Sequence, residues 1–163
     1  QALFDLLRIP DAIQALRPLL RDRGLWYLPI HFDGVTAFEP PHDSGLDGRV
    51  ETLYHESMTT DHDDGRAGDQ SGRRLLTHLR DAGSTLLEAG GSDWIVWPQD
   101  GDYPADEAYF LYHILHFIEN ELRGHPALDD DAFADWLSDR RRQIHEGRLT
   151  YIAHQLDVLA RPD

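Results

Sequence analysis

The stretch "LWYLPIHFDG", residues 25–34, decides the fold of this 163-residue chain. Apolar residues occupy both faces of the expected pleat, which predicts a strand over 25–32 that is covered on both sides. Pro29 has no N–H to donate, so we expect strand pairing to fade near it. The predicted strand leads into His31, Phe32 and Asp33. These residues lie at the carboxyl end of the strand, where open α/β sheets bind ligands.

A helix precedes this strand. In "PDAIQALRPLLRDRG", residues 10–24, apolar residues recur at the three- and four-residue spacing of one buried helix face. The pattern predicts a helix over 10–23, opened by Pro10 and stopped by Gly24. Pro18 lies inside the run and predicts a kink or break near Arg17.

The rest of the chain continues to alternate helices with strands. We expect an irregular connection over 33–47, a short helix around 50–58, a polar loop over 59–72, a helix from Ser71 to Gly83, strand structure over 85–97 with a bulge or break at Gly90 and Gly91, helices over 105–123 and 129–147, and a strand over 149–160. Ser71 is a candidate helix cap. The order predicts one α/β domain over 1–163 with three strands and flanking helices. So few strands leave unpaired edges, which indicates half of a larger sheet.

The composition is strongly acidic and restricts the partners. There are 30 acidic and 15 basic residues, for a net charge of -15, and every basic residue is Arg. Such a surface repels nucleic acids and anionic membranes, because binding to both depends on Lys and Arg. A Lys-free, Asp-rich composition is typical of proteins from a halophilic cytoplasm.

Other chemistry is restricted as well. The chain has no cysteine, which excludes disulfides, thiolate metal sites and Cys nucleophiles and fits a cytoplasmic location. No apolar run approaches the ~20 residues that a membrane span requires. The first residues, "QALFD", do not read as a signal peptide. Because the chain begins with Gln1 and not with Met, we expect it to be part of a longer gene product.

Three clusters contain residue types that occur in metal or phosphate sites, and each has a simpler interpretation. "DHDDG", residues 61–65, has ligand types but falls in the polar loop, where fixed geometry is not expected. His113 and His116 share a helix face, yet their apolar neighbours favour core or interface histidines over ligands. Arg140, Arg141 and Arg142 are best read as a helix C-terminal turn that complements the macrodipole, and less well as a phosphate site.

Two longer segments resemble the C-terminal half of a class I S-adenosylmethionine-dependent methyltransferase. "AIQALRPLLRDRGLWYLPIHFDG", residues 12–34, resembles the helix, turn and fifth strand of that family. "LLTHLRDAGSTLLEAGGSDWIVWP", residues 75–98, looks like the helix before the sixth strand and that strand itself. The resemblance places "GRLTYIAHQLDVLA", residues 147–160, as the seventh strand, antiparallel between the other two. "LRPLLRDRG" departs from the family's tighter Pro-Gly-Gly turn.

The resemblance implies a partial Rossmann-like sheet that shapes an acceptor pocket. The family's glycine-rich cofactor loop is missing from this chain, and Gly90 and Gly91 do not replace it. S-adenosylmethionine is therefore expected in the parent protein, together with the N-terminal half of the same protein and an unknown methyl acceptor. We expect the chain alone to be inactive and not to bind the cofactor.

The acceptor side is expected at the end of the first strand. His31 is the candidate base, because its free pKa lies near neutrality. Phe32, Asp33, Tyr54 and His55 are the candidate substrate-binding residues, and 33–70 is a candidate lid. The simpler interpretation is that His31 only ends a strand and that the helix containing Tyr54 and His55 only packs.

Two other functions remain open. The first is a stand-alone interaction or dimerisation domain without catalytic activity, which would use the wide apolar face of the helix over 105–123. The second is a metal-dependent hydrolase built on the His and Asp clusters. A homo-oligomer is compatible with the first of these.

Overall fold

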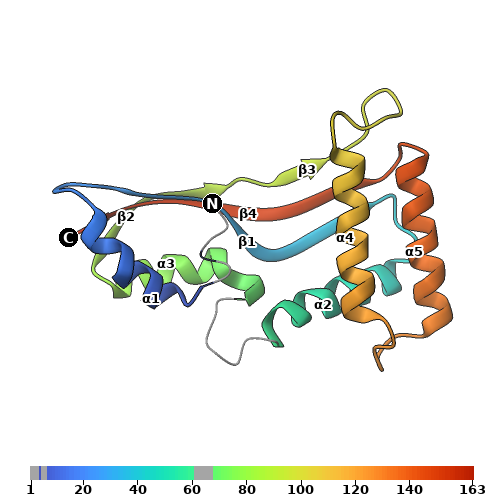
Figure 1. Cartoon of the computed structure of the whole chain (residues 1–163), viewed down its shortest axis with the longest axis horizontal. Coiled ribbons are helices and arrows are strands. Elements are labelled where there is room, and N and C mark those ends of the chain that lie inside the picture. Colours follow the sequence, from blue (N-terminus) through green and yellow to red (C-terminus); the bar gives the residue numbers. More distant parts are fainter. Residues whose placement is uncertain (1–3, 5–6, 61–67) are drawn as a thin grey trace. The chain divides into compact units, whose positions relative to one another are not determined.

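The predicted alternation of helices and strands is present in the computed structural model, which describes residues 4, 7–60 and 68–163 (Figure 1). The elements in chain order are α1 (Ile9–Leu16), the 3-10 turn η2 (Arg17–Leu19), β1 (Trp26–Glu39), α2 (Ser44–Thr60), the 3-10 turn η3 (Gly68–Gln70), α3 (Ser71–Asp81), β2 (Ser84–Gly91), β3 (Trp94–Val96), α4 (Glu107–Leu122), α5 (Asp130–His145) and β4 (Thr150–Pro162). The predicted break near Arg17 is confirmed, because α1 gives way there to η2. None of the helices in the described residues is long and apolar enough to cross a membrane.

The strands form one four-stranded antiparallel sheet with the order β1-β4-β2, and β3 pairs with β4. The last strand of the chain therefore lies between the first two, which is the position predicted for it. β2 and β4 pair from Ser84 opposite Pro162 to Gly91 opposite Leu156, with an irregularity between Leu86 and Glu88. The strand region over 85–97 is two strands, and the break falls after Gly91.

β1 is longer than predicted, and the predicted irregular connection over 33–47 is wrong at both ends, because residues 33–39 belong to β1 and residues 44–47 to α2. The strand passes Pro29 because the carboxylate of Asp157 accepts the Ile30 N–H at 2.9 Å and so replaces a backbone partner. Ile30 adopts a positive φ of 61°, which bends the chain at this point. Beyond it, Thr36 and Phe38 alternate with less buried neighbours, the pattern of a half-covered strand.

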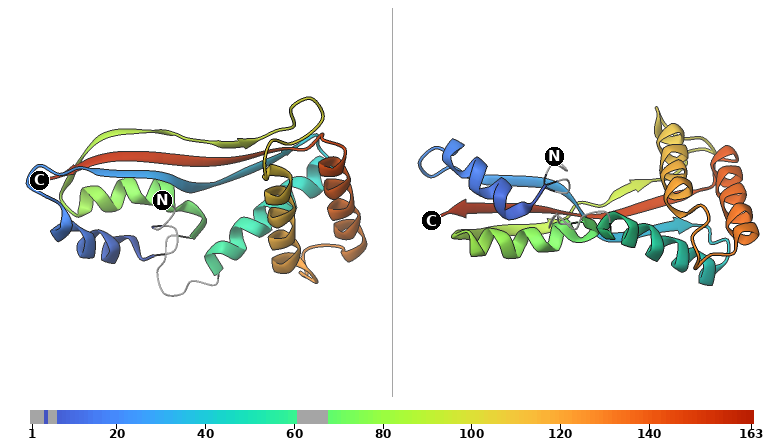
Figure 2. Two further views of the ribbon diagram at one scale, coloured as in Figure 1. Left: turned by 45° about the horizontal axis from the view of Figure 1, so that its top comes forward. Right: turned by 60° about the horizontal axis from the view of Figure 1, so that its bottom comes forward.

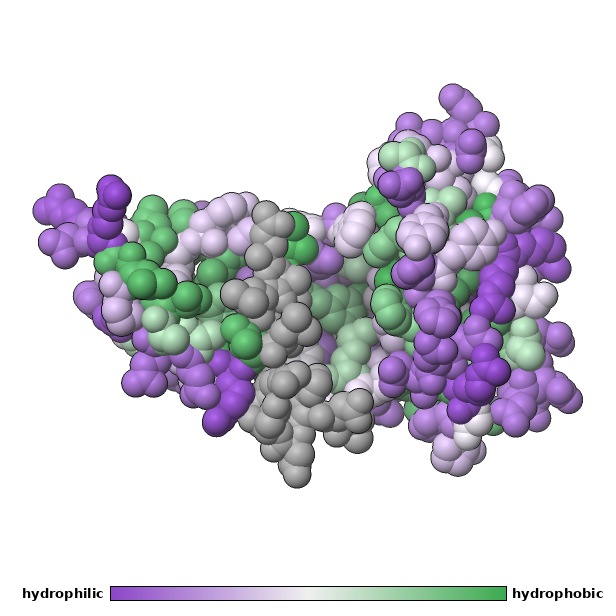
Figure 3. Space-filling view, viewed as in Figure 1, coloured by the Kyte–Doolittle hydropathy of each residue, from purple (hydrophilic) through white to green (hydrophobic). Residues whose placement is uncertain are grey.

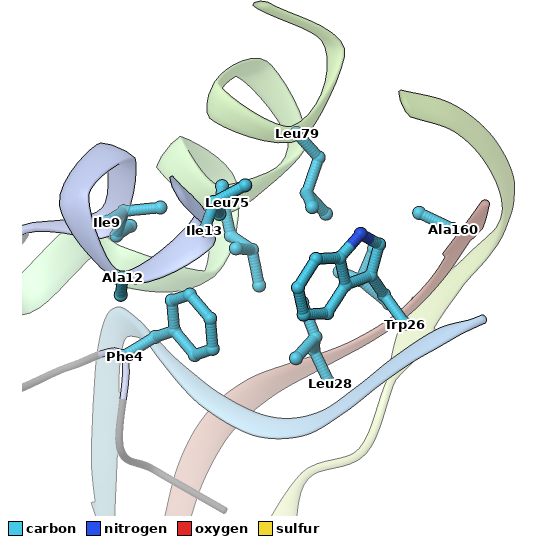
Figure 4. Packing of buried hydrophobic residues seen from close by; sticks show 10 residues of the cluster. Phe4, Ile9, Ala12, Ile13, Trp26, Leu28, Leu75, Leu79 and Ala160 are labelled. Atoms are coloured by element: carbon cyan, nitrogen blue, oxygen red, sulfur yellow. The ribbon is translucent and has the colours of Figure 1, made fainter. Parts of the chain in front are cut away.

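Contact clustering divides the chain into two compact units, and each is described by itself. The first unit contains Gln1–Val35, Met58–Trp94 and Ala153–Asp163. In it α1 and α3 cover one face of the strands, as both views of Figure 2 also show. Their core side chains meet those of the strands in a cluster of Phe4, Ile9, Ala12, Ile13, Trp26, Leu28, Leu75, Leu79, Val158 and Ala160 (Figure 4).

The opposite face of these strands is open, so the prediction of a strand covered on both sides is wrong. Trp26 and Leu28 are buried, whereas Tyr27 between them is 63% exposed. Leu87 on β2 is also exposed, next to the partly buried Leu86. A depression of about 290 Å³ lies on the open side and is lined by Tyr27, Asp157 and the end of β2. Tyr27 donates its hydroxyl to Asp157 there at 2.8 Å.

The second unit contains Thr36–Ser57 and Ile95–Ile152. Its helices α4 and α5 lie side by side, and hydrophilic residues cover most of their outer surface in the view of Figure 3. The buried face of α4 is formed by Leu111, Leu115, Ile118 and Leu122. Trp136 and Arg140 of α5 are fully buried, so Arg140 is a core residue and not part of an exposed C-terminal turn.

Two helix starts differ in how they are capped. Asp129 caps α5, because its side chain accepts the N–H of Ala132 at 2.9 Å. Ser71, the predicted cap, is the first residue of α3, and its hydroxyl donates to the carbonyl of Phe32 at 3.1 Å. The capping bond to α3 comes from a residue distant in sequence, Asp33 on β1.

Candidate functional site

The site begins at Asp33, a buried carboxylate that joins β1 to the start of α3. Its Oδ1 accepts the backbone N–H of Arg73 at 2.8 Å, and so caps α3 from another element. The Arg73 guanidinium adds a fork: Nε donates to Oδ1 and Nη2 to Oδ2, both at 2.9 Å. This bidentate pair neutralises the carboxylate, and its hydrogen bonds raise the pKa of Arg73.

Gly72 makes this approach possible. A Cβ at Gly72 would lie 2.9 Å from the carbonyl oxygen of His31 and 3.3 Å from the side chain of Asp33. Any other residue would push the first turn of α3 away from β1. Glycine here brings the positive end of the helix dipole next to the carboxylate.

His154 on β4 is the second part of the site. Its Nδ1 lies 2.6 Å from Oδ1 of Asp93, a residue in the short connection between β2 and β3. Its Nε2 lies 4.0 Å from Oδ2 of Asp33. A carboxylate can only accept, so the neutral imidazole carries its proton on Nδ1, and its Nε2 lone pair points toward Asp33.

These residues come together because of the strand order. β1 and β2 both run antiparallel to β4, so they are parallel to each other and lie on either side of it. Asp93 follows the end of β2, where Ser92 donates its N–H to the carbonyl of Gln155 at 2.8 Å. Asp33 lies on β1, and His154 stands between the two carboxylates. The arrangement can hold a hydrogen-bond donor and accept its proton.

The sequence-predicted residues of the first unit lie on β1 next to this site, but they differ in how far they are exposed to solvent. His31 is 1% exposed, and its ring meets the edge of the Phe4 ring with centroids 5.8 Å apart. Phe32 is partly buried, and its carbonyl accepts the hydroxyl of Ser71. Asp33 takes part in the site, whereas His31 is packed into the core. The accessible histidine is His154, with 34% of its side chain exposed.

Sequence reasoning did not find His154, Asp93 or Arg73. His154 and Gln155 are adjacent polar residues in the strand-like run "TYIAHQLDV", residues 150–158, which was a usable signal. Arg73 and Asp93 carry no local signal, because only the pairing of distant segments brings them to Asp33 and His154.

Tyr54 and His55 belong to the second unit. They are neighbours on α2, and Nε2 of His55 lies 2.9 Å from Oγ1 of Thr36 in a buried hydrogen bond. Burial, with a smaller contribution from Glu121, raises the pKa of Tyr54 to about 12. Tyr54 is therefore a neutral hydrogen-bond donor at physiological pH.

The other predicted clusters carry little chemistry. Residues 61–65 lie outside the described residues. Within the part of the chain that the structure describes, no group of three or more His, Asp or Glu side chains could hold a metal ion. His113 and His116 are exposed on α4 and not part of the core; His116 pairs with Asn120 at 2.9 Å.

No protein-family model matches the chain, and no curated protein matches it. The functional assignment therefore rests on the fold and on the geometry of the site.

Proposed function

We propose that the chain is the acceptor-side, C-terminal portion of a class I S-adenosylmethionine-dependent methyltransferase. The observation that carries the proposal is the strand order β1-β4-β2, with β4 antiparallel between two parallel strands. That order agrees with the fifth, seventh and sixth strands of the family. The helices α1 and α3 precede β1 and β2 in the chain, as the resemblance requires, and cover one face of the sheet.

The open sheet supports the same proposal. In the described residues β1 is an edge strand, since its neighbour in the sheet order is β4 alone. The face with exposed Tyr27 and Leu87 is apolar and uncovered within the first unit. An apolar face and a long free edge are liabilities for an isolated sheet. Additional strands beside β1, and helices on the open face, would remove both, and we propose that the N-terminal half of the parent protein supplies them.

The residues present do not fit the cofactor. In this family the cofactor lies against a glycine-rich turn that links a strand to a helix. Among the described residues, strands lead into helices through "PPHD" (40–43) and "WPQDGDYPAD" (97–106), and neither is glycine-rich. Gly90 and Gly91 end a strand that is followed by another strand. Cofactor binding therefore belongs to the proposed N-terminal half, and this chain supplies acceptor contacts.

Direct binding tests the proposal. The full-length gene product is expected to bind S-adenosylhomocysteine in isothermal titration calorimetry, and residues 1–163 alone are expected not to. The coding sequence upstream of Gln1 should contain a strand followed by a glycine-rich turn that opens a helix. A full-length product that binds neither S-adenosylhomocysteine nor S-adenosylmethionine would overturn the proposal.

A second function, an interaction domain, is favoured by the outer face of α4. Tyr109 and Phe117 are 66% and 50% exposed, and the ring of His113 between them is tilted against that of Tyr109, with centroids 4.3 Å apart. Such an aromatic stripe is unusual on a surface that is otherwise hydrophilic. If the upstream sequence lacks a cofactor loop, this function gains over the first.

A further inference from the structure

We infer that Asp33 and His154 form a subsite for an amine, in which His154 is the proton-accepting residue and Asp93 the positioning residue. The role of this subsite in catalysis rests on the proposed function, because the amine would be the methyl acceptor. Its ability to bind an amine does not depend on the cofactor.

The orientation of His154 is the first step. The short contact between Nδ1 and Asp93 fixes the tautomer and directs the Nε2 lone pair away from Asp93. Asp93 also accepts the N–H of Gln155 at 3.4 Å, so its carboxylate is held against the backbone of β4. A histidine held in this way accepts a proton at Nε2, and the resulting imidazolium is stabilised by the carboxylate behind it.

The spacing of the two acceptors is the second step. Nε2 of His154 and Oδ2 of Asp33 lie 4.0 Å apart. One nitrogen atom can lie within ordinary hydrogen-bond distance, about 2.8 Å, of both. An amino group has two or more N–H donors for these two acceptors, whereas a hydroxyl has only one. The pair therefore fits an amine better than an alcohol.

Charge is the third step. The guanidinium of Arg73 neutralises Asp33, so with a neutral His154 the group of four residues carries the single negative charge of Asp93. This favours a cationic ligand, which an amine is at physiological pH. In the proton transfer the N–H bond of the ammonium breaks, its electron pair stays on nitrogen, and Nε2 of His154 forms the new N–H bond. The amine is left with a free lone pair.

Nuclear magnetic resonance of the full-length protein tests the subsite, with histidine labelled by ¹⁵N. The spectrum of the neutral His154 ring should show the tautomer protonated on Nδ1. Adding n-butylamine should shift the His154 signals in a saturable way. Tetramethylammonium has the same charge but no N–H, and at equal ionic strength it should shift them little. n-Butanol should bind more weakly than the amine.

Two variants and one control complete the test. Asp93→Asn should mix the tautomers and weaken butylamine binding by about tenfold, as for the loss of one charged hydrogen bond. His154→Gln should abolish saturable binding, which is followed through the backbone signals of Arg73. Asp22→Asn removes one exposed carboxylate of the same unit outside the subsite and should change nothing.

The inference is overturned if His154 is protonated on Nε2 in the unmodified protein, or if tetramethylammonium produces the same shifts as butylamine. Failure of cofactor binding with intact amine binding would reject the methyltransferase proposal and leave the subsite in place.

Discussion

The buried pair of Arg140 and Asp47 gives the sharpest prediction for the stability of the second unit. Arg140 is fully buried and lies 2.5 Å from Oδ1 of Asp47. Its guanidinium also donates to the carbonyl of Pro40 and lies over the rings of Phe38 and Trp136. The pair ties the loop after β1 and the start of α2 to α5.

Asp47→Asn keeps the shape of the side chain and removes its charge. The buried guanidinium then loses the carboxylate that it contacts directly, and breaking a buried pair in this way costs about 3–5 kcal/mol. For a domain of this size, with a urea m-value of about 2 kcal/mol/M, the midpoint of unfolding should fall by about 2 M. Urea unfolding followed by tryptophan fluorescence measures this shift, because Trp136 donates to Asp47 at 2.6 Å.

Glu146→Gln is the matched control. It removes the carboxylate of an exposed pair with Arg148 at 3.0 Å, for which the expected cost is at most about 1 kcal/mol. The reasoning fails if Asp47→Asn costs no more than this control, since the charge of Asp47 would then not be needed to keep Arg140 buried.

Three further predictions concern a glycine, a titrating carboxyl and a surface. A Cβ on Gly147 would lie 1.9 Å from the carbonyl oxygen of Gly101, and the φ of Gly147 is 59°, so Gly147→Ala should lower the thermal midpoint. Gly48 in α2 has open space around it, so the control Gly48→Ala should raise the free energy of unfolding by up to about 1 kcal/mol. Burial and, less strongly, Asp47 raise the pKa of Glu51 to about 7. The carboxyl of Glu51 therefore holds its proton more tightly in the folded state than in the unfolded state. The protein should lose stability, relative to the Glu51→Gln variant, as the pH rises from about 4.5 through 7. Equal pH profiles of the two proteins would contradict this prediction. If α4 is an interface, Phe117→Ser should lower the mass seen in sedimentation equilibrium without changing the unfolding midpoint, and an unchanged mass would reject the interface.

The sequence predicts the succession of elements well, because helix and strand periodicities are local. The kink at Pro18 and the acidic start of α5 follow from single residues and their neighbours. The end of β1 could not be predicted, because the residue that carries the strand past Pro29 is Asp157, on a strand at the other end of the chain. Rules that use only neighbouring residues register the missing N–H of Pro29, but they do not include the distant carboxylate that accepts the N–H of Ile30.

Of the candidate site, the sequence indicated Asp33 but none of the residues that surround it. The rule that ligands bind at the carboxyl ends of strands pointed to Asp33 because the strand was expected to end at residue 32, whereas β1 continues to Glu39 and Asp33 lies within it. It failed to separate His31 from His154, because both are histidines in apolar strands and their exposure depends on which face each strand presents. A bend at Ile30 changes that face, and after it His31 packs against Phe4. The polar pairs of the site form between β1 and α3 and between β4 and the end of β2. A site built from such cross-chain pairs can be located by sequence only to an edge of the sheet, and its chemistry appears when the strand order is known.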